Sequence, residues 1–212
     1  MGTYLFDFDG TLVDSMPPYA AMMRKILDDH QVAYGPDIIK IITPLGYRGT
    51  ARYFCQIGLD RPESELVELM NQNAIEAYTY HIEAKKNVVP VLKELKARGH
   101  DLNVLTASPH TMLDPCLKRI GIFDLFTNVW SCEDFATVKS DPEIYRMVAE
   151  RLGKPIGEIL FLDDNYNADR VAKSAGMRVC GVYDPFSEEY VTEIKAVTDM
   201  YIDDFLQLLD VS

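Results

Sequence analysis

Short apolar runs recur along the chain, and each is followed by a segment with the periodicity of an amphipathic helix. The runs are rich in Val, Ile, Leu and Phe and cover residues 3–8, 101–106, 158–163 and 178–182, with a weaker run at 128–131. Strands that alternate with helices predict βαβ units and a mostly parallel sheet with helices on both faces. We therefore expect an α/β fold with a Rossmann-like parallel sheet, in which ligands bind outside the carboxyl ends of the strands.

A long stretch without a convincing strand separates the first run from the second. It shows helical periodicity in several pieces: Tyr19 to His30, about Asp37 to Ile42, Gly49 to Gln56, and Pro62 to His81. Since one helix is enough to connect two parallel strands, several helices predict an inserted helical domain. We assign residues 1–14 and 87–212 to the α/β core and residues 15–86 to the insertion.

Composition and charge narrow the class of protein. With 48% hydrophobic and 25% charged residues over 212 positions, the chain can bury the core of a globular protein. The net charge of -12 repels nucleic-acid phosphates, so we expect no nucleic-acid partner. No run approaches the roughly 18 apolar residues that span a bilayer, and the N-terminus lacks the form of a signal peptide. We expect a cytoplasmic protein without a membrane partner, present as a monomer or a weak dimer.

The strongest local signal is a pair of acids directly after the first predicted strand. Because side chains alternate along a strand, Asp7 and Asp9 point to the same side, and Gly10 lets the chain turn after them. Two carboxylates held this close repel each other unless a cation intervenes, and Mg2+ prefers oxygen ligands. The same pattern is common in turns and at helix N-caps, so the pair alone leaves both interpretations open.

A second pair of acids, Asp163 and Asp164, ends another predicted strand. A parallel sheet would bring this pair beside the first one. Adjacent acids can also cap the next helix, but buried strands that end in unpaired charge are rare without a metal or a partner. The two acidic clusters together favour a metal site.

Two further positions have the chemistry of a phosphate site. Thr106 ends the second predicted strand and is followed by Ala107, Ser108 and a helix start, where a hydroxyl and backbone N–H groups can hold phosphate oxygens. Thr is also a routine N-cap residue. Lys139 precedes another predicted helix, and taken alone it would be read as a solvent-exposed lysine.

Taken in order, these segments resemble the four motifs of the haloacid dehalogenase superfamily: Asp7 to Thr11, Thr106, Lys139, and the Asp163–Asp164 pair. The resemblance extends from Thr3 to an expected closing helix at Asp203 to Leu209. The inserted helices lie where the branch that contains phosphoglycolate phosphatase and β-phosphoglucomutase carries a helical cap of the C1 type.

The resemblance implies catalytic roles for Asp7, Asp9, Lys139 and Thr106. Asp7 is the expected nucleophile, and its carboxylate is also expected to bind Mg2+. Asp9 is expected to bind Mg2+ through its backbone carbonyl, which leaves its side chain free to act as general acid and base. Lys139 is expected to steady Asp7 and the phosphoryl group.

It also implies roles in binding the phosphate and the metal, and Thr106 has a part in the first of these. Thr106, with Ala107 and Ser108, is expected to hold phosphate oxygens. Asp164 is expected to complete the metal shell, and Asp163 either binds the metal directly or supports a ligand from outside the shell.

These roles imply a magnesium-dependent phosphatase that acts on a small phosphorylated metabolite through an aspartyl phosphate on Asp7. A phosphomutase of the β-phosphoglucomutase type would keep the same residues and is the alternative, and a non-catalytic scaffold is less favoured because all four motifs are present. A true dehalogenase would lack an acid at Asp9. In the insertion, Arg48 and Arg52 would lie one helical turn apart and could bind an anionic substrate; two solvated arginines are the other interpretation.

Overall fold

The computed structural model describes residues 2–210 and divides the chain into two compact units. One unit combines the residues up to Asp14 with those from Glu83 onward, and the other is Ser15–Ile82. Residues 83–86, which the sequence pattern assigned to the insertion, belong to the first unit.

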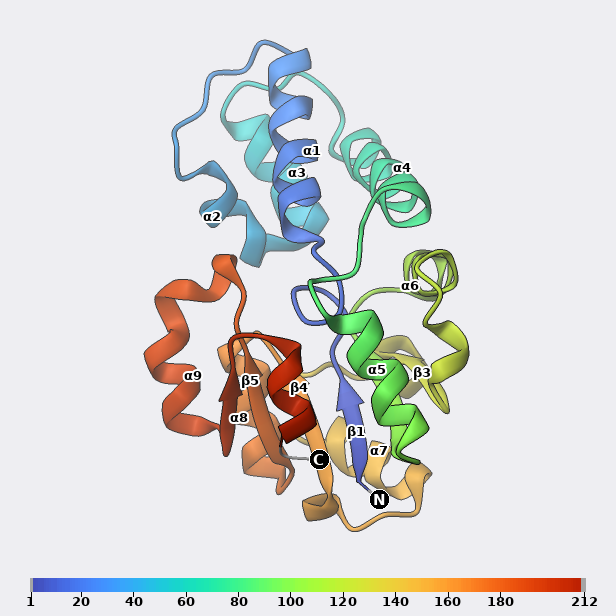
Figure 1. The fold of residues 1–212 in the computed structure, drawn as a ribbon. Coiled ribbons are helices and arrows are strands. Elements are labelled where there is room, and N and C mark those ends of the chain that lie inside the picture. The colour runs from blue at the N-terminus through green and yellow to red at the C-terminus, as the bar shows by residue number, and fades with distance from the viewer. Residues whose placement is uncertain (1, 211–212) are drawn as a thin grey trace. The chain divides into compact units, whose positions relative to one another are not determined.

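A six-stranded parallel sheet forms the centre of the first unit (Figure 1). Its strands follow the order β3-β2-β1-β4-β5-β6, and every neighbouring pair is parallel. The strands are β1 (Thr3–Phe6), β2 (Asp101–Thr106), β3 (Asn128–Ser131), β4 (Ile159–Asp163), β5 (Arg178–Val182) and β6 (Met200–Ile202). The predicted parallel α/β sheet is confirmed. The edge strand β6 was not predicted, because three residues carry too little apolar pattern to be recognised.

Helices cover both faces of this sheet. Figure 1 shows α5 and the final 3-10 helix η6 in front of the strands, and α7 and α8 behind them. The helices are α5 (Val88–Ala97), α6 (His110–Arg119), α7 (Glu143–Leu152), α8 (Tyr166–Ala175) and α9 (Val191–Val197). Across residues 2–210, no helix combines the length and apolar character that crossing a membrane would require.

The final segment is a 3-10 helix, η6 (Phe205–Asp210), which overlaps the closing helix expected at Asp203 to Leu209. The backbone N–H groups of Asp203 and Asp204 donate to Oε1 of Gln207, and the Asp204 carboxylate accepts from the N–H of Leu206. These side-chain bonds replace the first turn of an α-helix and leave a tighter, shorter segment.

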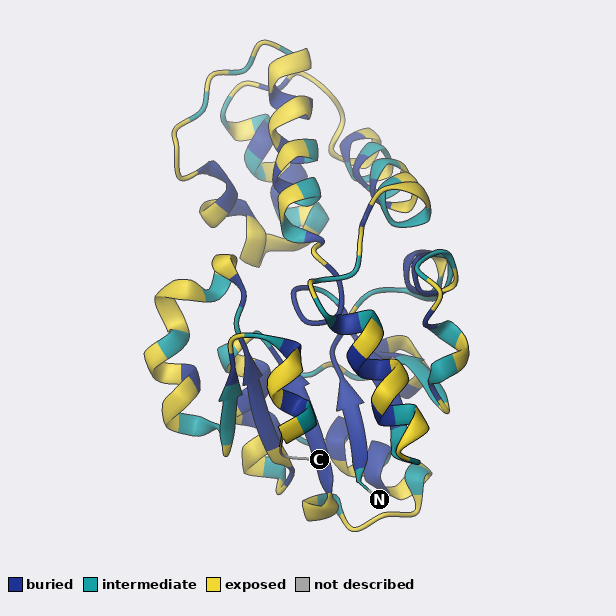
Figure 2. Cartoon of the chain, viewed as in Figure 1, coloured by how far each residue is buried: buried dark blue, intermediate teal, exposed yellow. Residues whose placement is uncertain are grey.

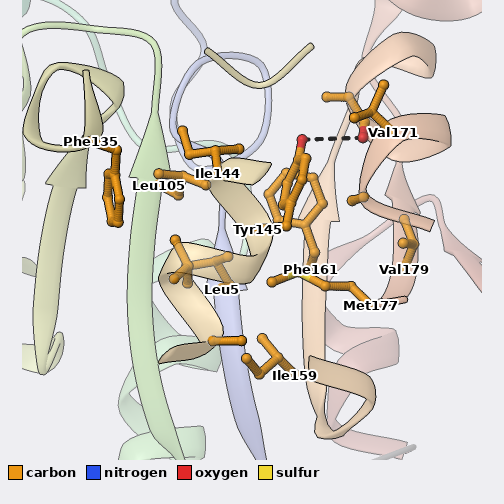
Figure 3. Close-up of a cluster of buried hydrophobic side chains, with 14 of the residues drawn as sticks. Leu5, Leu105, Phe135, Ile144, Tyr145, Ile159, Phe161, Val171, Met177 and Val179 are labelled. Atoms are coloured by element: carbon orange, nitrogen blue, oxygen red, sulfur yellow. Dashed lines mark hydrogen bonds between the residues drawn. The ribbon is translucent and has the colours of Figure 1, made fainter. Parts of the chain in front are cut away.

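The central strands are buried along their length (Figure 2). Alternation along β1 sends Leu5 to one face of the sheet and Tyr4 and Phe6 to the other. Leu5 joins a cluster of buried side chains from the strands, α7 and α8 (Figure 3). Burial on both faces explains why β1 and β4 read as continuous apolar runs in the sequence.

Tyr145 of α7 connects this cluster to the polar edge of the sheet. Its ring packs edge-on against Phe161, with 5.2 Å between the ring centroids. Its hydroxyl lies 3.1 Å from the carbonyl oxygen of Lys139 and 3.2 Å from that of Ala168, the contact drawn in Figure 3. The hydroxyl therefore ties the loop that carries Lys139 to the start of α8.

The second unit has a helical core of its own. Its helices are α1 (Met16–Asp29), α2 (Ile38–Ile42), α3 (Gly46–Gln56) and α4 (Glu63–Tyr80). Apolar residues on one face of each helix pack together, among them Met23 and Leu27 of α1, Phe54 of α3 and Met70 of α4. This periodicity is the signal that predicted a helical insertion.

The two segments that lead to the second unit pair with each other inside the first. Val13 and Ala84 form an antiparallel bridge. The N–H of Asp14 donates to the carbonyl of Glu83, and the N–H of Lys85 donates to the carbonyl of Leu12, both at 3.0 Å. The connection is therefore held in register beside the loop that follows β1.

Asp169 of α8 is an exception to the apolar packing behind the sheet. Its side chain is fully buried, and neither carboxylate oxygen has a hydrogen-bond partner within the described chain. Burial, together with the charges of Asp163 and Asp164, raises the pKa of Asp169 to about 10. The folded protein therefore keeps this carboxyl protonated, while the unfolded chain ionises it above about pH 4.

We predict that Asp169→Asn stabilises the protein at pH 8, because it removes the free-energy cost of protonating this carboxyl when the chain folds. Because the folded-state pKa is raised, the contribution of Asp169 to stability is greatest below pH 4 and falls by on the order of 1 kcal/mol per pH unit up to about pH 10. Denaturant unfolding at pH 5 and pH 8 should show a gain for Asp169→Asn that grows with pH. A gain that is absent or independent of pH would contradict the assigned protonation state.

Candidate active site

Three carboxylates converge where the two central strands end. Asp7 directly follows β1, and Asp163 is the last residue of β4, with Asp164 next to it. The strands are neighbours, and the N–H of Asp7 donates to the carbonyl of Leu162 at 2.8 Å. One oxygen from each of the three carboxylates lies within 4.8 Å of the other two. The structure thus brings Asp7 together with the second acidic pair.

Lys139 lies among these acids. Its ammonium donates to Oδ1 of Asp7 and, at 2.8 Å, to Oδ2 of Asp163. Only 14% of its side chain is exposed, so it is not the solvated lysine that its sequence position alone would suggest. Although desolvation lowers the pKa of Lys139, the charges of Asp163 and Asp7 outweigh it and raise the pKa well above its ordinary value. Lys139 therefore carries a permanent positive charge.

One ammonium does not balance three carboxylates. Burial raises the pKa of Asp7 well above its ordinary value, against the opposing effect of Lys139. Burial, with the charges of Asp163 and Asp184, likewise raises the pKa of Asp164 to about 7. The three carboxylates therefore have less neighbouring positive charge than would balance them, which is typical of a site that binds a cation.

Asp163 and Asp164 differ in the donors that they accept. Both oxygens of Asp163 are engaged, because Oδ1 accepts from the N–H of Asn165 at 2.8 Å and Oδ2 from Lys139. Asp164 accepts from two hydroxyl groups: Thr11 on Oδ1 at 3.3 Å and Ser187 on Oδ2 at 3.1 Å. Asp164 therefore has neutral donors on both oxygens, whereas Asp163 is bonded to a positive charge.

The hydroxyls on Asp164 were not among the predicted site residues. Thr11 lies inside the first motif and is fully buried. Ser187 follows β5, which is the neighbour of β4, so its place at the carboxyl edge of the sheet was the available signal. Nothing in the spacing indicated that it would turn toward Asp164.

Asp9 is held apart from the three converging carboxylates. Its Oδ2 accepts from the hydroxyl of Ser108 at 2.6 Å. The N–H of Ser108 in turn donates to Oγ1 of Thr106 at 3.0 Å. Thr106 is buried at the end of β2, and Ala107 between them is exposed. The second motif therefore lies beside the side chain of Asp9, with Ser108 as the direct contact.

Gly10 makes the turn after Asp9 possible. Its φ of +74° lies in the left-handed region that favours glycine. A Cβ at this position would lie 2.6 Å from Oδ2 of Asp164. The turn thus needs a glycine both for its backbone conformation and for its approach to a carboxylate.

Arg48 and Arg52 both lie on α3 of the second unit and are exposed. The side chain of Arg52 is 3.7 Å from the carboxylate of Glu63 within the same unit. The arginines belong to the second unit and the aspartates to the first, so the role of Arg48 and Arg52 in substrate binding stays a prediction.

The fold and the carboxylate cluster define the class of protein, and sequence comparison gives the family. A parallel α/β sheet whose central strands end in acids, with a lysine between them, is the arrangement that the four motifs imply. Residues 1–176 match the model for haloacid dehalogenase-like hydrolases, so the chain belongs to this family. It is therefore a hydrolase by family membership.

Individual relatives and structures agree with this assignment. A phosphoglycolate phosphatase from Haemophilus influenzae is 26% identical, over 97% of this chain and 96% of its own length. A structure assigned as a β-phosphoglucomutase from Thermotoga maritima matches with a TM-score of 0.83 at 21% identity, covering 100% of this chain and 98% of that one. YfnB from Bacillus subtilis, solved with bound magnesium, matches with a TM-score of 0.82 at 17% identity, covering 99% and 97%. The two structures show a shared fold.

We predict that Gly10→Ala destabilises the protein. The left-handed backbone costs a non-glycine residue about 1–2 kcal/mol, and the methyl group must also displace the Asp164 carboxylate. Gly35→Ala is the matched control, because a Cβ there meets nothing within 4 Å and its φ requires no glycine. Denaturant unfolding should show a clear loss for the first variant and almost none for the second. Equal stabilities would mean that the turn is not constrained as described.

Proposed function

We propose that this protein is a magnesium-dependent phosphatase that hydrolyses a small phosphorylated metabolite, with Asp7 as its nucleophile. The observation that carries the proposal is the position of Asp7, buried at the end of β1 and bonded to the ammonium of Lys139. Lys139 and a bound Mg2+ would together oppose the burial that raises the pKa of Asp7 and would favour the ionised carboxylate, which is the form able to attack phosphorus. The family relatives named as phosphatases support the same chemistry.

The residues present fit a Mg2+ ion. Hard cations take carboxylate and carbonyl oxygens, and Asp7 and Asp164 supply carboxylates that lack enough neighbouring positive charge. Asp9 would add its backbone carbonyl. Asp163 fits a supporting role better than a direct one, because it is already paired with the ammonium of Lys139, whereas Asp164 accepts bonds from two neutral hydroxyls. Bound there, Mg2+ would neutralise charge on the phosphoryl oxygens during transfer.

In the first step, a carboxylate oxygen of Asp7 attacks phosphorus and the bond to the leaving oxygen breaks. Asp9 donates a proton to that oxygen, in an orientation that the Ser108 hydroxyl holds. Lys139 balances the negative charge near Asp7, and the hydroxyl of Thr106 binds a phosphoryl oxygen. Since Oγ1 of Thr106 already accepts from Ser108, its own proton is available to donate.

In the second step, water attacks the aspartyl phosphate. Asp9, now ionised, accepts a proton from that water, the bond between phosphorus and Asp7 breaks, and inorganic phosphate leaves. Asp7 and Asp9 then return to their starting states. One water is consumed for each phosphate released.

We propose that the helical insertion acts as a cap that selects the substrate, with Arg48 and Arg52 as candidate contacts. The likeness in fold to a protein assigned as a β-phosphoglucomutase keeps a phosphomutase as the alternative. That reaction would use the same Asp7 chemistry but return the phosphoryl group to a second position on a sugar. The phosphatase is favoured because a phosphoglycolate phosphatase from Haemophilus influenzae matches along nearly the whole chain.

The proposal is tested with a panel of small phosphorylated metabolites that includes phosphoglycolate and hexose phosphates. The wild type should release inorganic phosphate in step with substrate loss, and only with Mg2+ present. Asp7→Asn keeps the shape of the side chain but removes the nucleophile, so phosphate release should fall to background.

Asp37→Asn is the matched control, since Asp37 is exposed and its side chain makes no cap bond; its rate should equal that of the wild type. Magnesium-dependent turnover that persists in Asp7→Asn would overturn the covalent mechanism. Isomerised sugar phosphate without free phosphate would instead establish the mutase.

A further inference from the structure

The ammonium of Lys85 lies at the junction between the connection to the second unit and the catalytic edge of the sheet. It donates to three acceptors: the carbonyl of Gly10 at 2.6 Å, the carbonyl of Tyr183 at 2.7 Å and Oδ2 of Asp184 at 2.9 Å. An ammonium has three donors, so all of them are used. The Lys85 side chain is 17% exposed and that of Asp184 is 1% exposed. A buried pair of this kind is costly to break, because one charge would be left without a partner.

These three bonds join two segments that come from distant parts of the chain. Gly10 belongs to the turn after β1, and Tyr183 and Asp184 follow β5, which is two strands away in the sheet. A cavity of about 420 Å3 lies beside Lys85 and is lined by residues of both connecting segments and of the end of β5. Side-chain packing therefore does not fill this space. The Lys85 ammonium bonds the two segments to each other directly.

Each of the two segments places a hydroxyl on the carboxylate of Asp164. The residue after Gly10 is Thr11, whose hydroxyl donates to Oδ1 of Asp164. On the other side, Asp184 accepts the N–H of Phe186 at 2.9 Å, and the N–H of Ser187 donates to the carbonyl of Asp184 at 3.0 Å. The hydroxyl of Ser187 then donates to Oδ2 of Asp164. Each oxygen of Asp164 is thus oriented by a hydroxyl from a segment that Lys85 holds.

We infer that Lys85 is a positioning residue for the divalent cation: by bonding Gly10, Tyr183 and Asp184, it fixes the Thr11 and Ser187 hydroxyls that orient Asp164 as a metal ligand. The inference rests on the proposed metal site. Groups that orient a metal ligand typically change affinity about 10–100-fold when they are removed. We therefore expect loss of Lys85 to weaken divalent cation binding at least about tenfold.

The direction of the effect separates positioning from simple charge. Lys85 is itself a cation, so its removal should tighten the binding of a second cation if only Coulomb repulsion matters. Positioning predicts the opposite, namely weaker binding. The double variant Lys85→Met/Asp184→Asn removes one positive and one negative charge together and leaves the net charge unchanged. It should still bind the cation more weakly than the wild type.

The test measures Mn2+ affinity in the full chain, from the electron paramagnetic resonance signal of free Mn2+, without any substrate. Lys86→Met is the matched control, because Lys86 is the neighbouring lysine, its side chain is 85% exposed, and it lies 3.8 Å from the Asp204 carboxylate. Its affinity should equal that of the wild type. Circular dichroism establishes that each variant is folded before it is compared.

Weaker Mn2+ binding by Lys85→Met and by the double variant supports the inference, and equal or tighter binding overturns it. Should Lys85→Met not fold, Ser187→Ala decides, since it removes one hydroxyl from Asp164 and keeps the lysine. An unchanged Mn2+ affinity in Ser187→Ala overturns the inference. Failure of the proposed metal site looks different. In that case the wild type and Asp164→Ala bind Mn2+ equally, and the inference fails together with the site.

Discussion

The crowding of carboxylates at the carboxyl edge of the central strands is the constraint around which the catalytic unit is organised. Asp7, Asp163 and Asp164 each offer an oxygen within 4.8 Å of the others, and a parallel sheet makes this convergence unavoidable once β1 and β4 are neighbours. Like charges at this distance and this degree of burial oppose folding. Lys139 offsets part of this repulsion through its bonds to Asp7 and Asp163.

The residues around the cluster hold the carboxylates and Lys139 in this arrangement. Tyr145 holds the backbone of Lys139 through its hydroxyl while its ring stays in the apolar cluster behind the sheet. Gly10 lets the chain turn within reach of Asp164 without a side chain in the way. Lys85 then bonds that turn to the segment after β5. Residues outside the carboxylate cluster therefore act on the site through the backbone segments that they hold.

Much of this arrangement could be predicted from the sequence, because it depends on local patterns. Buried parallel strands produce continuous apolar runs, and these located β1 to β5. Acids directly after two of the runs had to meet at one edge of a parallel sheet. Strand β6 was missed, because its three residues make too short a run. The closing helix was expected close to its observed position, but its 3-10 form was not, because the bonds between Gln207 and the two preceding aspartates depend on side-chain geometry that periodicity does not reveal.

The contacts that could not be predicted are long-range ones. Lys85 and Asp184 are far apart in sequence and become partners only when the end of β5 lies beside the connection to the second unit. Ser187 reaches Asp164 for the same reason. Asp169 falls on the buried face of α8, where the sequence pattern gave no reason to expect a carboxyl without a partner. In each case the residue type is ordinary, and only its surroundings in the fold give it a role.

The most direct test of the central claim, that Asp7 is the nucleophile, is to trap the phosphorylated protein. The full chain is mixed with Mg2+ and a phosphorylated substrate, quenched in acid within the first turnover, digested and examined by mass spectrometry. The account predicts that the peptide containing Asp7 gains the mass of one phosphoryl group, located on Asp7 itself. A phosphoryl group on another residue, or product formed in the first turnover while Asp7 stays unmodified throughout, would contradict it.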